Sequence, residues 1–208
     1  MFPNRGAIAV AGVALLLSAV SGATAWAHPH VWVDTTVTAL VKDGKVVALR
    51  QDWSFDEDFT ATVLADVRKV GGMAAMAQAK PFTPGEMSKL KQDAFSNLKN
   101  YNYFTHVWSG AKAVPLGKEV TGFSARMEGE RLAYTFTLPL AAPVEVKAGP
   151  LAIGVWDDTY YVDVGPAKDA PGGVEGEGSA ACRSRVVESK EHAIYNGSIY
   201  PKMVEITC

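Results

Sequence analysis

Two histidines near the beginning of the chain, His28 and His30, are the side chains best suited to chemistry. They flank Pro29 and directly follow Ala25-Trp26-Ala27, a small-x-small pattern that a signal peptidase cuts. Cleavage after Ala27 would make His28 the amino terminus, so that its α-amino group and imidazole could chelate one metal ion. His30 would add a second imidazole, a ligand that suits zinc, copper and nickel. Pro29 has no backbone N–H, which excludes a terminal site that needs a deprotonated second amide.

A purely structural interpretation of His28-Pro29-His30 is also open, in which both histidines form the solvated start of a strand. The next residues, Val31 to Leu40, are rich in β-branched and aromatic types and alternate as a strand does. The two-residue period then places His30, Trp32 and Asp34 on one face. Asp34 could therefore serve as a ligand or as a partner of a ligand.

Two acidic segments could contribute oxygen ligands. The first, Asp56-Glu57-Asp58, stands where a strand is expected to meet a helix; its carboxylates repel one another unless a cation or a helix N-terminus compensates. The second runs from Trp156 to Asp163 and contains two adjacent acids at a tight turn. Helix capping explains the first segment equally well, and an Asp bonding its own backbone explains the second.

The opening residues predict export. Residues 1–6 carry one cation, Arg5, residues 7–20 are almost wholly apolar, and small residues follow. This order is typical of a cleaved signal peptide, and the apolar run is shorter than the ~20 residues that a membrane anchor needs. We expect a signal peptide over residues 1–27, and a single periplasmic domain over residues 28–208 that does not span the membrane.

Composition narrows the functional classes. The net charge is −2 and no basic cluster is present, so nucleic acid and anionic membranes are poor candidates as partners. The chain has no nucleophile elbow, no phosphate-binding glycine loop and no His-Glu-x-x-His motif. We therefore do not expect an enzyme. His106 and His192 stand alone in the sequence and are interpreted as structural or surface residues.

The two cysteines, Cys182 and Cys208, predict a disulfide that holds the C-terminal segment. A thiolate metal pair is the alternative, and the oxidising compartment expected for an exported chain favours the disulfide.

The remaining pattern predicts an α+β fold dominated by a mainly antiparallel, sandwich-like sheet. Asp43-Gly44 predicts a hairpin between strands at 31–40 and 46–55. Two or three helices should follow this hairpin, one at 59–67 and another from Pro84 to about Lys99, which Thr83 and Glu86 begin with a capping box. Further strands are expected at 105–108, 120–128, 131–139, 151–157, 160–164, 183–188 and 203–207, with a mobile loop at 165–181.

Four segments together resemble the bacterial periplasmic family catalogued as domain of unknown function 1007. They are His28-Pro29-His30-Val31-Trp32-Val33-Asp34, Trp53-Ser54-Phe55-Asp56-Glu57, Tyr103-Phe104-Thr105 and Trp156-Asp157-Asp158-Thr159-Tyr160-Tyr161-Val162. The resemblance implies a periplasmic component of an ABC-type transport system that works with zinc or nickel/cobalt permeases. It carries over His28, His30, Asp56 and Asp157 as the candidate metal ligands. The stretch from Arg68 to Pro84 lacks the alternating acids of the calcium-like loop that some relatives carry.

The leading hypothesis is a periplasmic protein that binds a transition metal, zinc first and copper, nickel or cobalt as alternatives, and delivers it to an inner-membrane permease. A second hypothesis is an accessory subunit of a membrane transporter that binds no metal and presents exposed aromatics such as Tyr101 and Trp108. A third is a copper protein with a histidine brace at its terminus.

Overall fold

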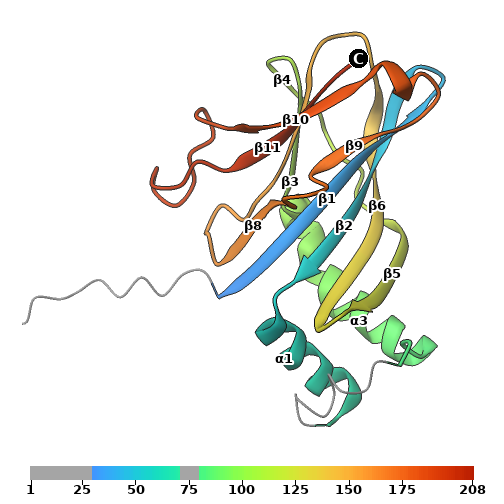
Figure 1. Cartoon of the computed structure of the whole chain (residues 1–208), viewed down its shortest axis with the longest axis vertical. Coiled ribbons are helices and arrows are strands. Elements are labelled where there is room, and N and C mark those ends of the chain that lie inside the picture. Colours follow the sequence, from blue (N-terminus) through green and yellow to red (C-terminus); the bar gives the residue numbers. More distant parts are fainter. Residues whose placement is uncertain (1–29, 71–79) are drawn as a thin grey trace, which may run out of the picture.

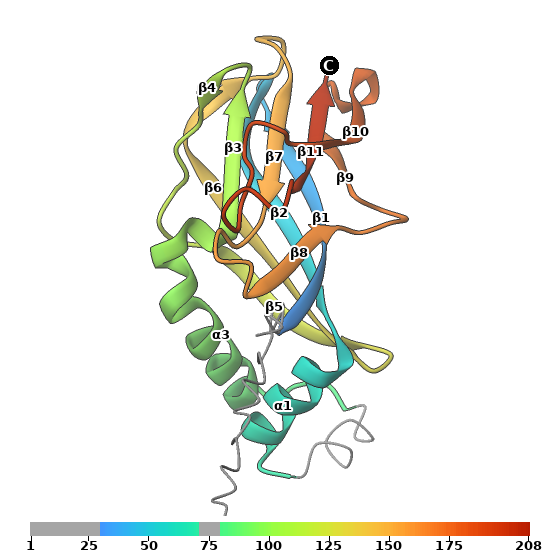
Figure 2. The same ribbon diagram turned by 90° about the vertical axis from the view of Figure 1, so that its left-hand side faces the viewer.

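The computed structural model describes residues 30–70 and 80–208, so His28 and the expected signal peptide lie outside the described residues. Two β-sheets pack on each other, and two helices lie at one end of the molecule, opposite the C-terminus (Figures 1 and 2). The expected α+β class with a sandwich-like sheet is confirmed. No helix in the described part of the chain is long and apolar enough to cross a membrane.

The first sheet has the order β5-β6-β2-β1-β8, with β9 also pairing with β1. Its strands are β1 (Val31–Lys42), β2 (Lys45–Phe55), β5 (Thr121–Glu128), β6 (Arg131–Glu145), β8 (Val162–Pro166) and β9 (Gly172–Gly176). The neighbours are antiparallel except for β8 and β9, which both run parallel to β1.

The second sheet has the order β10-β11-β7-β3-β4 and is antiparallel throughout. Its strands are β3 (Thr105–Ser109), β4 (Lys112–Ala113), β7 (Leu151–Val155), β10 (Arg183–Glu188) and β11 (Lys202–Thr207). The predicted disulfide joins Cys182, just before β10, to Cys208, just after β11, and so closes the end of this hairpin.

The β1–β2 hairpin follows from its sequence. Buried and exposed residues alternate along β1, and the two turn residues Asp43 and Gly44 have φ of 51° and 72°. Positive φ at both positions is the geometry that an Asp-Gly pair favours between two strands. The predicted hairpin is confirmed.

Both predicted helices are present after this hairpin: α1 (Glu57–Arg68) and α3 (Pro84–Leu98). Thr83 caps α3 with the complete capping box to Glu86, as its sequence indicates. A 3₁₀ segment, Lys99–Phe104, then leads into β3, and a second lies at Ser179–Ala181. The possible further turn between the helices falls on residues 71–79, outside the described residues.

The loop expected at 165–181 is wrong in part, because it contains β9 and the 3₁₀ turn. Gly172 and Gly176 have positive φ, and a Cβ at either position would lie within 2.4 Å of a β1 carbonyl oxygen. Glycine therefore lets β9 approach β1 closely enough to pair. The sequence pattern indicated only chain flexibility.

The core between the sheets contains a chain of buried hydrogen bonds. Trp53 Nε1 donates to Gln51 Oε1 at 2.9 Å, and Gln51 Nε2 donates to Thr105 Oγ1 at 2.9 Å. Thr105 Oγ1 donates in turn to the Tyr103 carbonyl. Because β2 and β3 belong to different sheets, Gln51 helps to fix the position of one sheet on the other, and both its amide oxygen and its amide nitrogen are hydrogen-bonded.

Replacing Gln51 by Ala should therefore lower the free energy of unfolding by about 2–4 kcal/mol, because it opens a cavity and leaves the buried Trp53 N–H without an acceptor. Urea denaturation measures the loss. The control is Thr38→Ala on the outer face of β1, with an expected change within about 0.5 kcal/mol. A loss that small for Gln51→Ala would contradict the structural role of the network.

Candidate functional site

The first residues of β1 are held from one side by Asp56, at the start of α1. The Asp56 carboxylate accepts from Phe59 N and from Trp32 N, each at 2.8 Å, and Asp56 N donates to the Trp32 carbonyl at 3.0 Å. Asp56 is thus the N-cap of α1 and also fastens β1 to that helix. Helix capping, which the sequence offered as the other explanation of the acids at 56–58, is therefore present at Asp56.

A turn built on Asp157 holds the same residues from the other side. Asp157 is buried, and its carboxylate accepts from the backbone N–H groups of Thr159, Tyr161 and Val162 and from the Thr159 hydroxyl. This turn presents the Tyr161 carbonyl, which accepts from His30 N at 2.9 Å. Asp157 therefore fixes the backbone position of His30 indirectly, because it holds Tyr161, whose carbonyl accepts from His30 N.

The structure brings three of the four predicted ligand residues to one end of β1, while His28 lies outside the described residues. His30 is exposed there, and its ring contacts the Tyr161 ring at 4.7 Å between centroids. The carboxylates of Asp56 and Asp157 already accept backbone hydrogen bonds. No group of three or more His, Cys, Asp or Glu side chains within 30–70 and 80–208 could hold a metal ion. Metal ligation by these residues stays a prediction.

The outer face of β1 continues into β8. Trp32 pairs with Asp163 and Asp34 with Gly165 in the parallel register, which places these residues side by side on one face. Asp34 forms a 2.7 Å ion pair with Arg131, whose other donors bind two carbonyls of β2. The interpretation of Asp34 as a metal ligand is weakened by this pairing.

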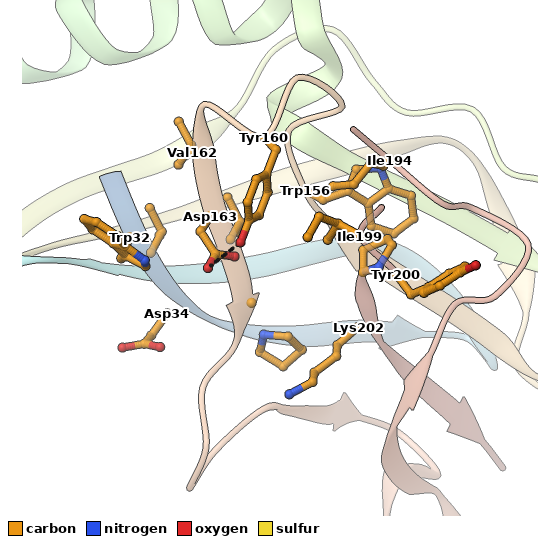
Figure 3. Close-up of a pocket in the computed structure, with 15 residues that line it drawn as sticks. Trp32, Asp34, Trp156, Tyr160, Val162, Asp163, Ile194, Ile199, Tyr200 and Lys202 are labelled. Carbon is orange, nitrogen blue, oxygen red and sulfur yellow. Dashed lines mark hydrogen bonds between the residues drawn. The ribbon is translucent and has the colours of Figure 1, made fainter. Parts of the chain in front are cut away.

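Beside this face lies a cleft of about 270 Å³, between β8 and the segment that leads into β11. Figure 3 shows Asp163 between Trp32 and Tyr160, with the Tyr160 hydroxyl donating to Asp163 Oδ2 at 3.3 Å. Lys202 lines the cleft from β11. Burial and the neighbouring Asp163 carboxylate raise the pKa of the Tyr160 hydroxyl, which therefore stays protonated at neutral pH.

Asp163 ends the second acidic segment of the sequence, but the sequence gives no sign that it lies beside Trp32 of β1. Its position depends on the parallel pairing of β8 with β1, which joins segments about 130 residues apart. The one signal in the sequence was that Asp163 interrupts the apolar run of 160–164. The alternation of a strand accounts for a polar residue at that position without any functional role.

The two isolated histidines also come together, on the outer side of the second sheet. His106 stacks on Trp156 with centroids 4.2 Å apart, and Trp108 contacts His192 at 4.2 Å. Gly154 makes room for this packing, since a Cβ there would lie 1.8 Å from the Trp156 ring. Desolvation, and to a smaller extent the nearby His192, lower the pKa of His106, although Asp158 and a backbone contact oppose the shift.

Replacing Asp157 by Ala should cost about 1–3 kcal/mol of unfolding free energy, because three backbone N–H groups lose their acceptor. Urea denaturation provides the measurement. Asp169→Ala, at an exposed position, is the matched control and should change stability by less than about 0.5 kcal/mol. Equal effects of the two substitutions would show that the turn does not depend on the Asp157 carboxylate.

His106 should make the protein less stable in acid. Its pKa in the folded state is below 6.5, so the unfolded chain binds a proton first and stability falls as the pH drops below about 6.5. His106→Phe keeps a ring in the stack and removes the proton. Unfolding free energies between pH 7.5 and 5 should fall less steeply for this variant, and parallel curves would contradict the assignment.

Comparison with known proteins places the chain in a family. The family described as "Protein of unknown function (DUF1007)" matches residues 13–205. An uncharacterized protein of Haemophilus influenzae is 26% identical over 137 residues, which cover 65% of this chain and 61% of that protein. An "Uncharacterized 15.5 kDa protein in trpE 3'region" of Spirochaeta aurantia is 33% identical over 130 residues, covering 61% of this chain and 89% of that protein.

The chain thus spans about three fifths of the Haemophilus influenzae relative and most of the Spirochaeta aurantia one. The names of both relatives leave their activity open, whereas the family match runs through the hairpin, both helices and the turn at Asp157. The resemblance noticed in the sequence motifs is confirmed, and the protein belongs to the DUF1007 family.

Proposed function

We propose that this protein captures a divalent transition-metal ion outside the cytoplasm and hands it to an inner-membrane permease. Zinc is the expected cargo, with copper, nickel and cobalt as alternatives. The observation that carries the proposal is the exposed His30, fixed at the end of a strand by its bond to Tyr161. His28 and Pro29 directly precede it in the sequence.

The mechanism is capture and transfer without covalent chemistry. Cleavage after Ala27 would free the His28 amine, so that the terminus offers nitrogen donors of intermediate softness. The contacts of Trp32 to Asp56 and of His30 to Tyr161 fasten the first residues of β1, so His30 has a fixed backbone position from which to bind the ion. A site with few ligands at an exposed strand end suits an ion that must also leave.

The location outside the cytoplasm has two supports. The Cys182–Cys208 disulfide is consistent with an oxidising compartment. The opening residues have the order of regions of a cleavable signal peptide. The periplasm follows as the proposed compartment, and the permease as the proposed partner.

A second candidate function is an accessory subunit that binds a membrane transporter without binding metal. Trp32, Tyr161 and Tyr200 favour it, since they are 49%, 50% and 48% exposed. Trp32 and Tyr200 line the same cleft from its two sides (Figure 3). Exposed aromatic side chains are frequent anchors of protein interfaces. Growth under zinc limitation separates the two functions. Replacing both His28 and His30 by Ala should leave growth unchanged if the protein is such a subunit, and should impair growth if it delivers the metal.

Protein that begins with an authentic His28 should bind one zinc ion in titration calorimetry. His30→Ala should weaken the affinity by on the order of 10-fold or more, because one imidazole donor is lost. Affinity should also fall as the pH drops below ~6.5, where imidazole becomes protonated.

The matched control keeps Ala27 in front of His28, which removes the terminal amine from the histidine while leaving the sequence from His28 onward unchanged. Its zinc affinity should fall as well. Absence of zinc binding by the authentic chain would refute the proposal.

A further inference from the structure

We propose that the cavity between the two helices and the first sheet, here called the helix cavity, binds an uncharged, lipid-like small molecule. Such a ligand has an apolar body and one hydrogen-bonding group, such as a hydroxyl. This inference goes beyond the proposed function and does not depend on it, because it uses no residue of the histidine terminus.

Two rows of apolar side chains form the walls of the helix cavity. They consist of Phe59, Val63 and Val67 on α1 and of Leu90, Ala94 and Leu98 on α3. A spacing of four residues places each row on one face of its helix. All of these side chains except Leu90 stay only partly buried. The helices, which Figure 2 shows at the lower end of the molecule, thus border an apolar space that their own side chains do not fill.

The first sheet forms the floor of the helix cavity. Val31 and Val33 of β1, Trp53 and Phe55 of β2 and Tyr134 of β6 all line it. Its volume is about 410 Å³, which lies within the range of ~300–1,000 Å³ that is usual for small-molecule sites. A mostly apolar lining of this size fits the body of an apolar ligand.

The hydroxyl of Tyr134 is the polar group that points to a ligand. Tyr134 is only 4% exposed, and its ring packs on Phe55 and Phe123 with centroids 4.9 and 5.2 Å apart. Within residues 30–70 and 80–208 its hydroxyl forms no hydrogen bond, whereas the hydroxyl of the equally buried Tyr103 donates to the Lys118 carbonyl at 3.0 Å. Because a buried tyrosine hydroxyl normally has a partner, a ligand in the cavity that Tyr134 lines would supply it.

The charges at the rim favour an uncharged ligand. Asp66 of α1 and Asp93 of α3 line the helix cavity and are exposed, and both form ion pairs with Lys89. No Lys or Arg of the described ranges lines the cavity itself, so an anionic head group would meet two carboxylates and no cation there. A cationic head group would gain little, because Lys89 already neutralises these acids.

Tyr134 can act as a donor to such a ligand at neutral pH. Burial, and to a smaller extent the charge of Asp93, raise the pKa of the Tyr134 hydroxyl, which therefore keeps its proton. The hydroxyl or carbonyl oxygen of an uncharged ligand can accept this proton in a hydrogen bond. The apolar walls would then cover the rest of the molecule.

A fluorescent probe tests the helix cavity directly. N-phenyl-1-naphthylamine is uncharged and fluoresces strongly only in apolar surroundings. The purified protein should increase its fluorescence with saturation at one equivalent, and dodecanol should displace it. Dodecanoate has the same chain length and a carboxylate, so at neutral pH it should displace the probe at least about 10-fold less well.

Substitutions that fill the space locate the binding site. Ala94→Phe adds a ring from the wall on α3 and Val63→Phe adds one from α1, so either should abolish binding of the probe. Ala113→Phe, at an exposed position on β4, adds the same ring outside the cavity and should leave binding unchanged. Thermal unfolding of each variant verifies that it is folded.

The role of the hydroxyl is tested by Tyr134→Phe. This change should weaken the affinity for dodecanol by about 3- to 10-fold, because one hydrogen bond to the ligand is lost. It should leave the melting temperature of the ligand-free protein unchanged. Tyr103→Phe is the matched control: it removes the bond to the Lys118 carbonyl, and should lower the melting temperature while leaving dodecanol binding unchanged.

Three results would overturn the proposal. The unaltered protein could fail to increase the fluorescence of the probe, or the increase could persist in both Ala94→Phe and Val63→Phe. Equal displacement by dodecanol and dodecanoate would contradict the uncharged class of ligand. A dimer in sedimentation that Ala94→Phe dissociates would show that a second copy of the chain, and no small molecule, covers the cavity.

Discussion

The architecture at the candidate site depends on the parallel pairing of β1 with β8. This pairing joins the beginning of the described chain to a segment about 130 residues later, and β8 is a short edge strand. The Asp157 carboxylate makes it possible, because it orders the turn before β8 and satisfies three backbone N–H groups. Asp56 completes the arrangement by capping α1 and holding Trp32 at the same time.

This arrangement gives one strand end two different properties. The backbone from His30 onward is fixed by hydrogen bonds to both sides, whereas the side chains of His30, Trp32 and Tyr161 remain exposed. A rigid backbone lowers the entropic cost of binding a ligand at its side chains. The exposed side chains leave a bound ligand accessible to a partner. The proposed carrier of a metal ion would need both properties, since it must bind the ion and then release it.

Much of the fold could be predicted from local signals. The Asp43-Gly44 hairpin, the capping box at Thr83 and the disulfide follow from short-range geometry and compartment, and all are present. A strand was expected at 160–164, close to β8, but its parallel pairing with β1 could not be predicted, because pairing over long range leaves no local pattern. Strand β9 was missed because its glycines resemble a loop. The same limit hid the place of Asp163 beside Trp32. Asp56 and Asp157 stood out in sequence, and the structure shows that both accept backbone hydrogen bonds, whereas their role as metal ligands stays a prediction.

X-ray absorption at the zinc edge reports directly which atoms surround a bound zinc ion, and so tests the proposed binding by the histidine terminus. For protein with an authentic His28 terminus loaded with one equivalent of zinc, the account predicts nitrogen and oxygen neighbours at about 2.0–2.2 Å, with the outer-shell scattering of two imidazoles. Because both cysteines form the disulfide, no sulfur should appear near 2.3 Å. A spectrum with only water-like oxygen neighbours and no imidazole scattering would contradict the account.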